Sequence, residues 1–299
     1  LVFGRRDEGT RARGVVDFLA ETIRVAQQFN IPHEILDTAA LRAMFPQLTI
    51  LDGDEGYFEP SAGFLFPDRC ISRQLELARA LGAETLVDTK VIAIERDDGS
   101  LSILSDKGRI AAARVVLTVG AWVNELLPEP LPVNFEIYPQ QLVWFELMAD
   151  PTLFSPERFP VFIRTGQPTL PGFYGFPALH GKAGGLKLAS EQYDVRCEPD
   201  AAVHHGSDAD AERVYRAASP FLPISRKLIR RKSCPYTVTS DSNFVIDFLP
   251  GMPEVLLASP CSGHGFKHSA GVGELLAELV LDGRSHLGGS EFRLNRFCN

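Results

Sequence analysis

Two lysines and one cysteine stand in surroundings that could support chemistry. Lys187 lies in Gly-Gly-Leu-Lys-Leu, Cys234 in Ser-Cys-Pro-Tyr-Thr, and Lys267 just after a glycine-rich turn. A lysine between leucines is usually a surface residue whose ammonium reaches water, and a free cysteine is usually a small buried hydrophobe. A fixed ammonium could also stabilise negative charge that develops in a reaction.

The residues from Glu254 to Asp282 predict a strand, a glycine turn and a helix, in that order. The strand covers residues 255–258, the turn covers residues 262–265, and an apolar helix follows. Free N–H groups and the positive end of the helix dipole favour a phosphate or a ligand that gains negative charge. Lys267 could reach the same ligand.

Periodicity and breaker residues predict the elements of the first part of the chain. We expect a helix from about residue 15 to 30, and a short helix that Thr38 caps and Pro46 ends. A third helix should start at an Asp68 cap and turn an apolar side inward, comprising Ile71, Leu75, Ala78 and Leu81. Residues 54–67 are interpreted as a loop, and residues 90–95, 101–104 and 109–113 as strands.

The apolar run 115–122 is typical of a parallel strand covered on both faces. After residue 128 the pattern changes to strands at 141–147, 161–164, 173–176 and 185–188 and before Cys234, with one helix at 208–218. Strands and helices alternate in the first and last parts of the chain, and the part between them is mostly β. This order favours two domains, with the middle part of the chain built on an antiparallel sheet.

Composition excludes several classes of protein. The 299 residues carry a net charge of -8, with a pI near 5.4, which argues against nucleic acid and anionic membranes as partners. No apolar run approaches the roughly 20 residues of a membrane span, and no signal peptide is recognisable, so a cytoplasmic enzyme is expected. Five dispersed cysteines suggest neither disulfides nor zinc, and the adjacent His204 and His205 point apart, so no metal is expected.

Seven motifs, taken in order, resemble the monomeric sarcosine oxidase and N-methyltryptophan oxidase family of FAD-dependent amine oxidases. They are LVFG, EPSAGFLFPDRC, VVLTVGAW, FYGFP, LKL, SCPYTVTSDSNFVID and SGHGFK, and they span nearly the whole chain. The resemblance implies a D-amino-acid-oxidase-like fold of class α/β plus α+β. An incomplete FAD-binding Rossmann-like domain would comprise residues 68–126 and 245–299, and a largely antiparallel substrate domain residues 1–67 and 127–244.

Family members carry a strand–GxGxxG–helix element in a leading segment, and no such element occurs in this chain. That segment was lost, lies outside the sequence given, or was never encoded.

The resemblance also implies roles for single residues. Lys187 would lie over the flavin and help oxygen react, and Cys234 would form a thioether to the flavin. Tyr174 and Tyr236 would line the substrate pocket, and Lys267 would bind the substrate carboxylate.

Further positions are implied to hold FAD through main chain and close packing. The strand at Val91 would contact the adenine, and Gly120 and Trp122 would lie against the cofactor, although Gly120 could equally serve only the turn. Gly263, His264, Gly265, Phe266 and Lys267 would present main-chain groups to the flavin pyrimidine, with no role required of the His264 side chain.

One position departs from the family pattern. Members that act on small N-methyl amino acids usually have a histidine four residues after the lysine equivalent to Lys187, whereas this chain has Glu191. A carboxylate repels an anionic substrate, so we expect a substrate other than sarcosine, basic or larger.

The predicted function is oxidation of a secondary (N-methyl) amino acid to an imine, with O2 reduced to hydrogen peroxide. The expected partners are FAD, a small amine and O2, with the chain acting as a monomer. Two alternatives stay open: a flavin dehydrogenase with another electron acceptor, and a non-catalytic remnant that binds no FAD.

Overall fold

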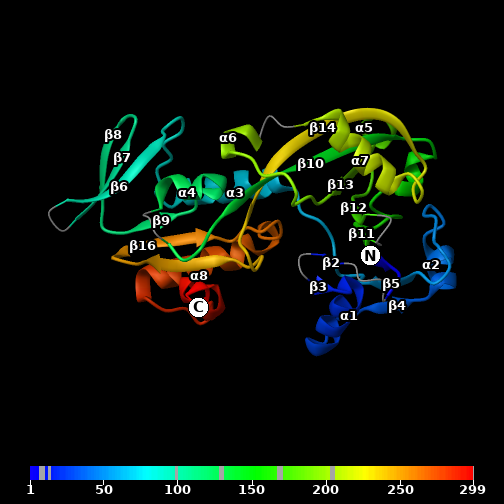
Figure 1. Ribbon diagram of the computed structural model, residues 1–299, viewed down its shortest axis with the longest axis horizontal. Coiled ribbons are helices and arrows are strands. Elements are labelled where there is room, and N and C mark those ends of the chain that lie inside the picture. The colour runs from blue at the N-terminus through cyan, green and yellow to red at the C-terminus, as the bar shows by residue number, and fades with distance from the viewer. Residues whose placement is uncertain are drawn as a thin grey trace. The chain divides into compact units, whose positions relative to one another are not determined.

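The computed structural model describes residues 1–6, 11–12, 15–97, 100–127, 131–166, 171–202 and 206–298. The chain forms two compact units (Figure 1). Unit 1 comprises Leu1–Phe64 and Tyr138–Pro235, and unit 2 comprises Leu65–Ile137 and Tyr236–Asn299. Among the described residues no helix has the length and apolar character needed to cross a membrane. His204 and His205 lie outside the described residues.

Unit 1 is built on one sheet of eight strands, in the order β14-β10-β13-β12-β11-β1-β5-β4. Strands β1 and β11 run parallel, whereas β1–β5, β4–β5, β10–β13, β11–β12 and β12–β13 are antiparallel pairs. The strands are β1 Val2–Gly4, β4 Glu34–Leu36, β5 Glu55–Phe58, β10 Glu136–Leu147, β11 Phe162–Arg164, β12 Phe173–Gly175, β13 Leu186–Ser190 and β14 Ile224–Val238. A small hairpin joins β2 Arg11–Ala12 and β3 Val15–Val16.

The two faces of this sheet differ in burial. On β10 and β13 one face carries Val143, Phe145, Leu186 and Leu188, all at most 2% exposed, and α7 Asp208–Ala218 packs on this side. On the other face Leu142 and Trp144 of β10 are only partly buried, as is Lys187 on β13. The other helices of unit 1 are α1 Phe18–Gln28, α2 Thr38–Met44, η2 Pro151–Phe154, α5 Gly181–Gly184 and α6 Pro199–Ala202.

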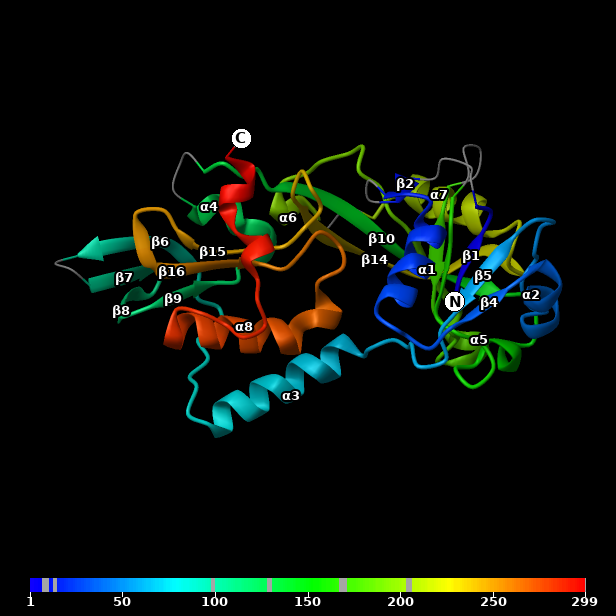
Figure 2. The same cartoon turned by 90° about the horizontal axis from the view of Figure 1, so that it is seen from below.

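Unit 2 contains two three-stranded sheets. One has the order β15-β16-β9, with β16 and β9 parallel, and the other the order β6-β7-β8. The apolar side of α8 Ser269–Asp282 packs on Ile246 and Leu256 of the first sheet. Figure 2 shows α8 running along one side of β15 and β16. The remaining elements are α3 Pro67–Ala80, β6 Val91–Asp97, β7 Ser100–Ser105, β8 Gly108–Ala112, β9 Val115–Leu117, η1 Gly120–Trp122, α4 Val123–Leu126, β15 Val245–Leu249, β16 Met252–Ser259, η3 Phe266–His268, η4 Ser290–Phe292 and η5 Leu294–Phe297.

The predicted inward side of α3 is wrong, because this helix has no buried residue. Leu75 is 41% exposed, Ile71 45% and Leu81 88%. Its N-cap is Phe66, with Pro67 in the first turn in place of the predicted Asp68 cap. The helix forms where the periodicity places it, but nothing among the described residues buries its apolar side.

Three other predictions need correction. The run 115–122 yields only a three-residue strand, and Val116 is 38% exposed, so β9 is not covered on both faces. The predicted loop 54–67 contains β5, which pairs with β1 and β4. Caps on α1 and α2 come from Asp17 and Asp37, whose carboxylates accept backbone N–H groups, so Thr38 is the first helical residue and not the cap.

Candidate functional site

Lys187 lies at the centre of the partly open face of the unit 1 sheet. Leu186 and Leu188 on either side of it are fully buried on the opposite face. The Lys187 Nζ atom lies 4.3 Å from the ring centroid of Phe176 and 5.5 Å from that of Trp144. Aromatic rings attract a cation through their quadrupole, so these two rings hold the ammonium in place. No carboxylate of the described residues forms an ion pair with it.

Burial lowers the pKa of Lys187 below its ordinary value. A smaller opposing effect comes from the Cys234 thiol, and the nearby cations of Arg230 and Lys232 lower the pKa further. Lys187 and Cys234, predicted separately, therefore lie close enough to influence each other's protonation.

Cys234 occupies a partly buried position on β14. Its Sγ atom donates to the carbonyl oxygen of Gln140, 3.8 Å away. Burial raises the pKa of the Cys234 thiol, while Lys187 and Lys232 act to lower it. The site therefore holds a thiol beside two cations, and cations of this kind favour the reactive thiolate.

Tyr174 lies on β12, the strand next to Lys187. It pairs with Ala189 of β13, and its ring centroid is 6.2 Å from that of Phe176. Residues paired across antiparallel strands share a face of the sheet, so Tyr174 lies on the same face as Ala189. Lys187 is two residues before Ala189 on β13 and therefore also lies on this face. Tyr174 is partly buried.

Glu191 follows β13 directly, and its carboxylate accepts a hydrogen bond from the Tyr193 hydroxyl at 2.9 Å.

The glycine turn in unit 2 is shaped by close contacts. At Gly263, where φ is +77°, a Cβ atom would lie 2.4 Å from the Tyr236 ring. At Gly265 a Cβ atom would lie 1.6 Å from the carbonyl oxygen of Pro260. Both positions therefore require glycine, and the structure brings the predicted Tyr236 against this turn.

The side chains of the turn are engaged locally. His264 stacks on Phe244 at 4.8 Å, and its Nε2 atom lies 3.0 Å from the Ser242 carbonyl oxygen. Lys267 is exposed and donates to the His264 carbonyl oxygen at 3.2 Å. Phe266 is 39% exposed. The imidazole of His264 thus anchors the turn through the Phe244 ring and the Ser242 carbonyl oxygen.

The remaining predicted cofactor residues also lie in unit 2. Val91 begins β6 and pairs with Ser105 of β7. Gly120 follows β9 with φ +55°, and no atom lies within 4 Å of the place where its Cβ would be. Trp122, 36% exposed, ends the same short helix η1. An open space beside a left-handed glycine permits close approach of a ligand.

Sequence reasoning missed four side chains around Lys187. They are Trp144, Phe176, Arg230 and Lys232. The alternation along 140–147 and the basic run 230–232 before Cys234 were visible signals. Their meaning depends on strand register, which places Trp144 directly opposite Lys187.

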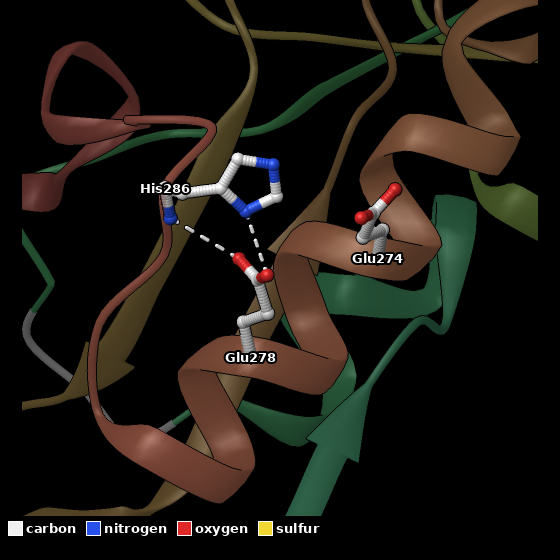
Figure 3. A group of neighbouring side chains, drawn as sticks. All are labelled: Glu274, Glu278 and His286. Atoms are coloured by element: carbon white, nitrogen blue, oxygen red, sulfur yellow. Dashed lines mark hydrogen bonds and ion pairs between the residues drawn. The ribbon is translucent and has the colours of Figure 1, made fainter.

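One group of possible metal ligands occurs among the described residues, formed by Glu274, Glu278 and His286, with ligand atoms within 4.8 Å of one another (Figure 3). The Glu278 carboxylate already accepts from the Ser285 hydroxyl, from the His286 N–H at 3.2 Å and from His286 Nδ1 at 2.7 Å. These bonds tie the segment after α8 back onto the helix.

The chain is similar to several known proteins. A family model described as FAD dependent oxidoreductase matches residues 6–279. Monomeric sarcosine oxidase of Bacillus sp. (strain B-0618) is 32% identical, over 99% of this chain and 74% of that protein. N-methyl-L-tryptophan oxidase of Salmonella dublin is 34% identical, over 94% of this chain and 73% of that protein.

Solved structures show the same fold. The open form of NikD, an unusual amino acid oxidase essential for nikkomycin biosynthesis, superposes with a TM-score of 0.80 at 19% identity, covering 98% of this chain and 75% of that one. L-proline dehydrogenase from P. horikoshii superposes with a TM-score of 0.75 at 21% identity, covering 93% of this chain and 72% of that one.

Proposed function

This chain belongs to the FAD-dependent oxidoreductase family, as the sequence resemblance predicted, and from that membership we propose that it oxidises a secondary (N-methyl) amino acid. The substrate loses two electrons and two protons to give an imine, which water hydrolyses. O2 takes up two electrons and two protons and leaves as hydrogen peroxide. The observation that carries the oxidase assignment is the Lys187 ammonium held between two rings, with no ion-paired carboxylate among the described residues.

The residues present fit FAD. Gly120 leaves open space beside a positive-φ backbone, Trp122 offers a partly exposed ring, and the turn at 263–265 precedes the start of α8. FAD supplies the electron acceptor for the C–N bond when bound. Main-chain N–H groups and the dipole of α8 would stabilise negative charge on the cofactor.

Residues of this chain would then bind the substrate, line its pocket and stabilise developing charge. Lys267 would bind the substrate carboxylate as a point charge, and Tyr174 and Tyr236 would line the substrate pocket. Lys187 would stabilise the charge of superoxide as it forms from O2. Val91 would contact the adenine.

Cys234 would attach the cofactor through a thioether. The new S–C bond replaces one S–H and one C–H bond, and the two electrons and two protons released pass to O2. The half-buried thiol beside Lys187 and Lys232 supports this role, because the two cations partly offset the burial that raises the pKa of the thiol.

The oxidase assignment is tested by Lys187→Met in the FAD-loaded protein. We expect the reduction rate by substrate to stay within a factor of about two, and reoxidation by O2 to slow by on the order of 10²-fold. Stopped-flow absorbance separates the two half-reactions. Equal oxygen reactivity in both proteins would contradict the role of Lys187. Slow reoxidation of the wild type by O2, together with fast reoxidation by a quinone, would favour the dehydrogenase.

Glu191 bears on which amine is oxidised. Its carboxylate, bonded to Tyr193, disfavours a small anionic substrate, so sarcosine should rank below basic or larger secondary amines. Initial rates of peroxide formation across a panel of N-methyl amino acids measure the order. Sarcosine emerging as the best substrate would refute this expectation.

A further inference from the structure

Four side chains form a row across neighbouring strands on the partly open face of unit 1. Phe176 follows β12, and its N–H donates to the Lys187 carbonyl oxygen, which sets these two residues side by side. Lys187 pairs directly with Trp144 of β10. Arg230 of β14, the strand beyond β10, places its guanidinium carbon 5.0 Å from the centroid of the Trp144 ring.

The two cations of this row, Lys187 and Arg230, share one aromatic ring. Among the described residues neither has a carboxylate within ion-pair distance, whereas three other basic residues of β14 do. Arg226 contacts Glu212, Lys227 contacts Glu146, and Arg231 contacts Asp208. Arg230 thus differs from these three residues because its guanidinium lies over the same Trp144 ring as Lys187 and has no carboxylate partner among the described residues.

We propose that Trp144 and Arg230 are positioning residues for Lys187, with Trp144 fixing where its ammonium lies and Arg230 holding a second positive charge over the same ring. The positioning of Lys187 does not depend on the proposed function, but its role in the reaction with O2 does. Trp144 supplies the face over which the ammonium rests. Arg230 supplies a like charge that cannot be discharged near neutral pH.

Charged and titratable groups of the described residues surround Lys187 on neighbouring strands. From β14 come Arg230, Lys232 and Cys234, and both cations act against protonation of Lys187 while Cys234 opposes them. From β10 comes Glu146, which is occupied by Lys227 and Ser225. The remaining groups are Tyr174 on β12 and Glu191 after β13, whose carboxylate is bonded to Tyr193.

The chain offers a matched control one residue away. Arg231 carries the same charge on the same strand, but its guanidinium bonds to the Asp208 carboxylate. Arg231→Gln therefore removes one positive charge from β14 without touching the Trp144 ring. Arg230→Lys keeps the charge and loses the planar stacking group.

The experiment is competitive acetylation of Lys187 by trace acetic anhydride on the purified chain between pH 7 and 11, with the labelled peptide quantified by mass spectrometry. It needs neither FAD nor activity. Arg230→Gln should shift the midpoint of labelling to higher pH and lower labelling at a fixed pH by about two- to fivefold. Arg231→Gln should leave the midpoint within error, and Arg230→Lys should restore it.

Trp144→Leu supplies the second arm. Loss of the ring frees the ammonium, so Lys187 should label faster above its midpoint, while Lys232 labels as before. An unchanged Lys187 profile in Arg230→Gln, or equal shifts in Arg230→Gln and Arg231→Gln, would overturn the inference. Failure of the Lys187→Met oxygen test with these labelling shifts present would remove only the oxidase assignment.

Discussion

Gly265 occupies a position where even a methyl group would collide with main chain. The added carbon would lie 1.6 Å from the Pro260 carbonyl oxygen, so the backbone of the glycine turn would have to move. Gly273 in α8 lies in open space with no atom within 4 Å of its Cβ position. A side chain therefore cannot fit at Gly265 without movement of the backbone, whereas one fits freely at Gly273.

Gly265→Ala should destabilise the protein by about 2–4 kcal/mol, because relief of the clash displaces the turn. Gly273→Ala, the matched control, should stabilise it by roughly 0.5–1 kcal/mol through lost backbone freedom in the unfolded chain. Urea unfolding followed by circular dichroism measures both. A neutral Gly265→Ala would show that the turn adapts and is not fixed by Pro260.

Among single residues, the sequence identified candidates but not their neighbours in space. Lys187 and Cys234 were singled out from motifs, and their proximity emerges only from strand register. Trp144 and Arg230 were missed, because an aromatic residue in a strand and an arginine in a basic run have many ordinary uses. The contact of Gly263 with Tyr236 joins residues far apart in the chain, which no local pattern encodes.

Among the elements, the turn after β14 is tied to the last short helix, η5. Asp241 forms an ion pair with Arg296 at 2.7 Å and accepts hydrogen bonds from the Thr239 hydroxyl and the Asn243 N–H. Burial acts to raise the pKa of Asp241, but the bonds from Arg296, Asn243 and Thr239 together outweigh it and lower the pKa to about 2. The ionised carboxylate therefore stabilises the folded state.

The sign of the pH dependence follows from this lowered pKa. Stability from Asp241 is fully present above about pH 4, near its ordinary pKa, and is lost as the pH falls towards 2. Asp241→Asn should cost about 1 kcal/mol at pH 7, after allowance for solvent screening of a carboxylate that is 34% exposed, and almost nothing near pH 2.

Chemical unfolding at several pH values measures that difference. Asp88 is exposed and has no bonding partner among the described residues, so Asp88→Asn is the control and should change little at any pH. A cost for Asp241→Asn that persists unchanged at pH 2 would show that the carboxylate charge is not its source.

Elements were predictable where a local pattern coincides with what tertiary packing provides. Residues 208–218 were predicted as a helix with the bounds that α7 has, because its apolar spacing meets the buried face of the sheet. In α3 the same spacing located the helix but not its surroundings, since periodicity reports an apolar side and not what covers it. β5 was hidden in a Gly- and Pro-rich stretch whose strand character comes from pairing with β1 and β4.

For the whole molecule, the family and the fold could be predicted because seven motifs keep their order along the chain, and order is far more specific than any one motif. The sequence pattern also predicted two domains, and the chain passes between the two units within β10 and β14, beside Pro139 and Pro235. Substrate identity could not be predicted in this way, since it depends on a few side chains such as Glu191.

The central claim is that this chain is a flavoprotein oxidase with its cofactor fixed at Cys234. The most direct measurement is an absorption spectrum of the purified chain, supplied with FAD, before and after acid precipitation, together with its intact mass. The account predicts that yellow colour stays with the precipitate, that the mass grows by one FAD, and that Cys234→Ser releases the colour to the supernatant. A colourless precipitate with the mass of the bare chain would contradict covalent attachment, and a protein that retains no flavin before precipitation would contradict the oxidase itself.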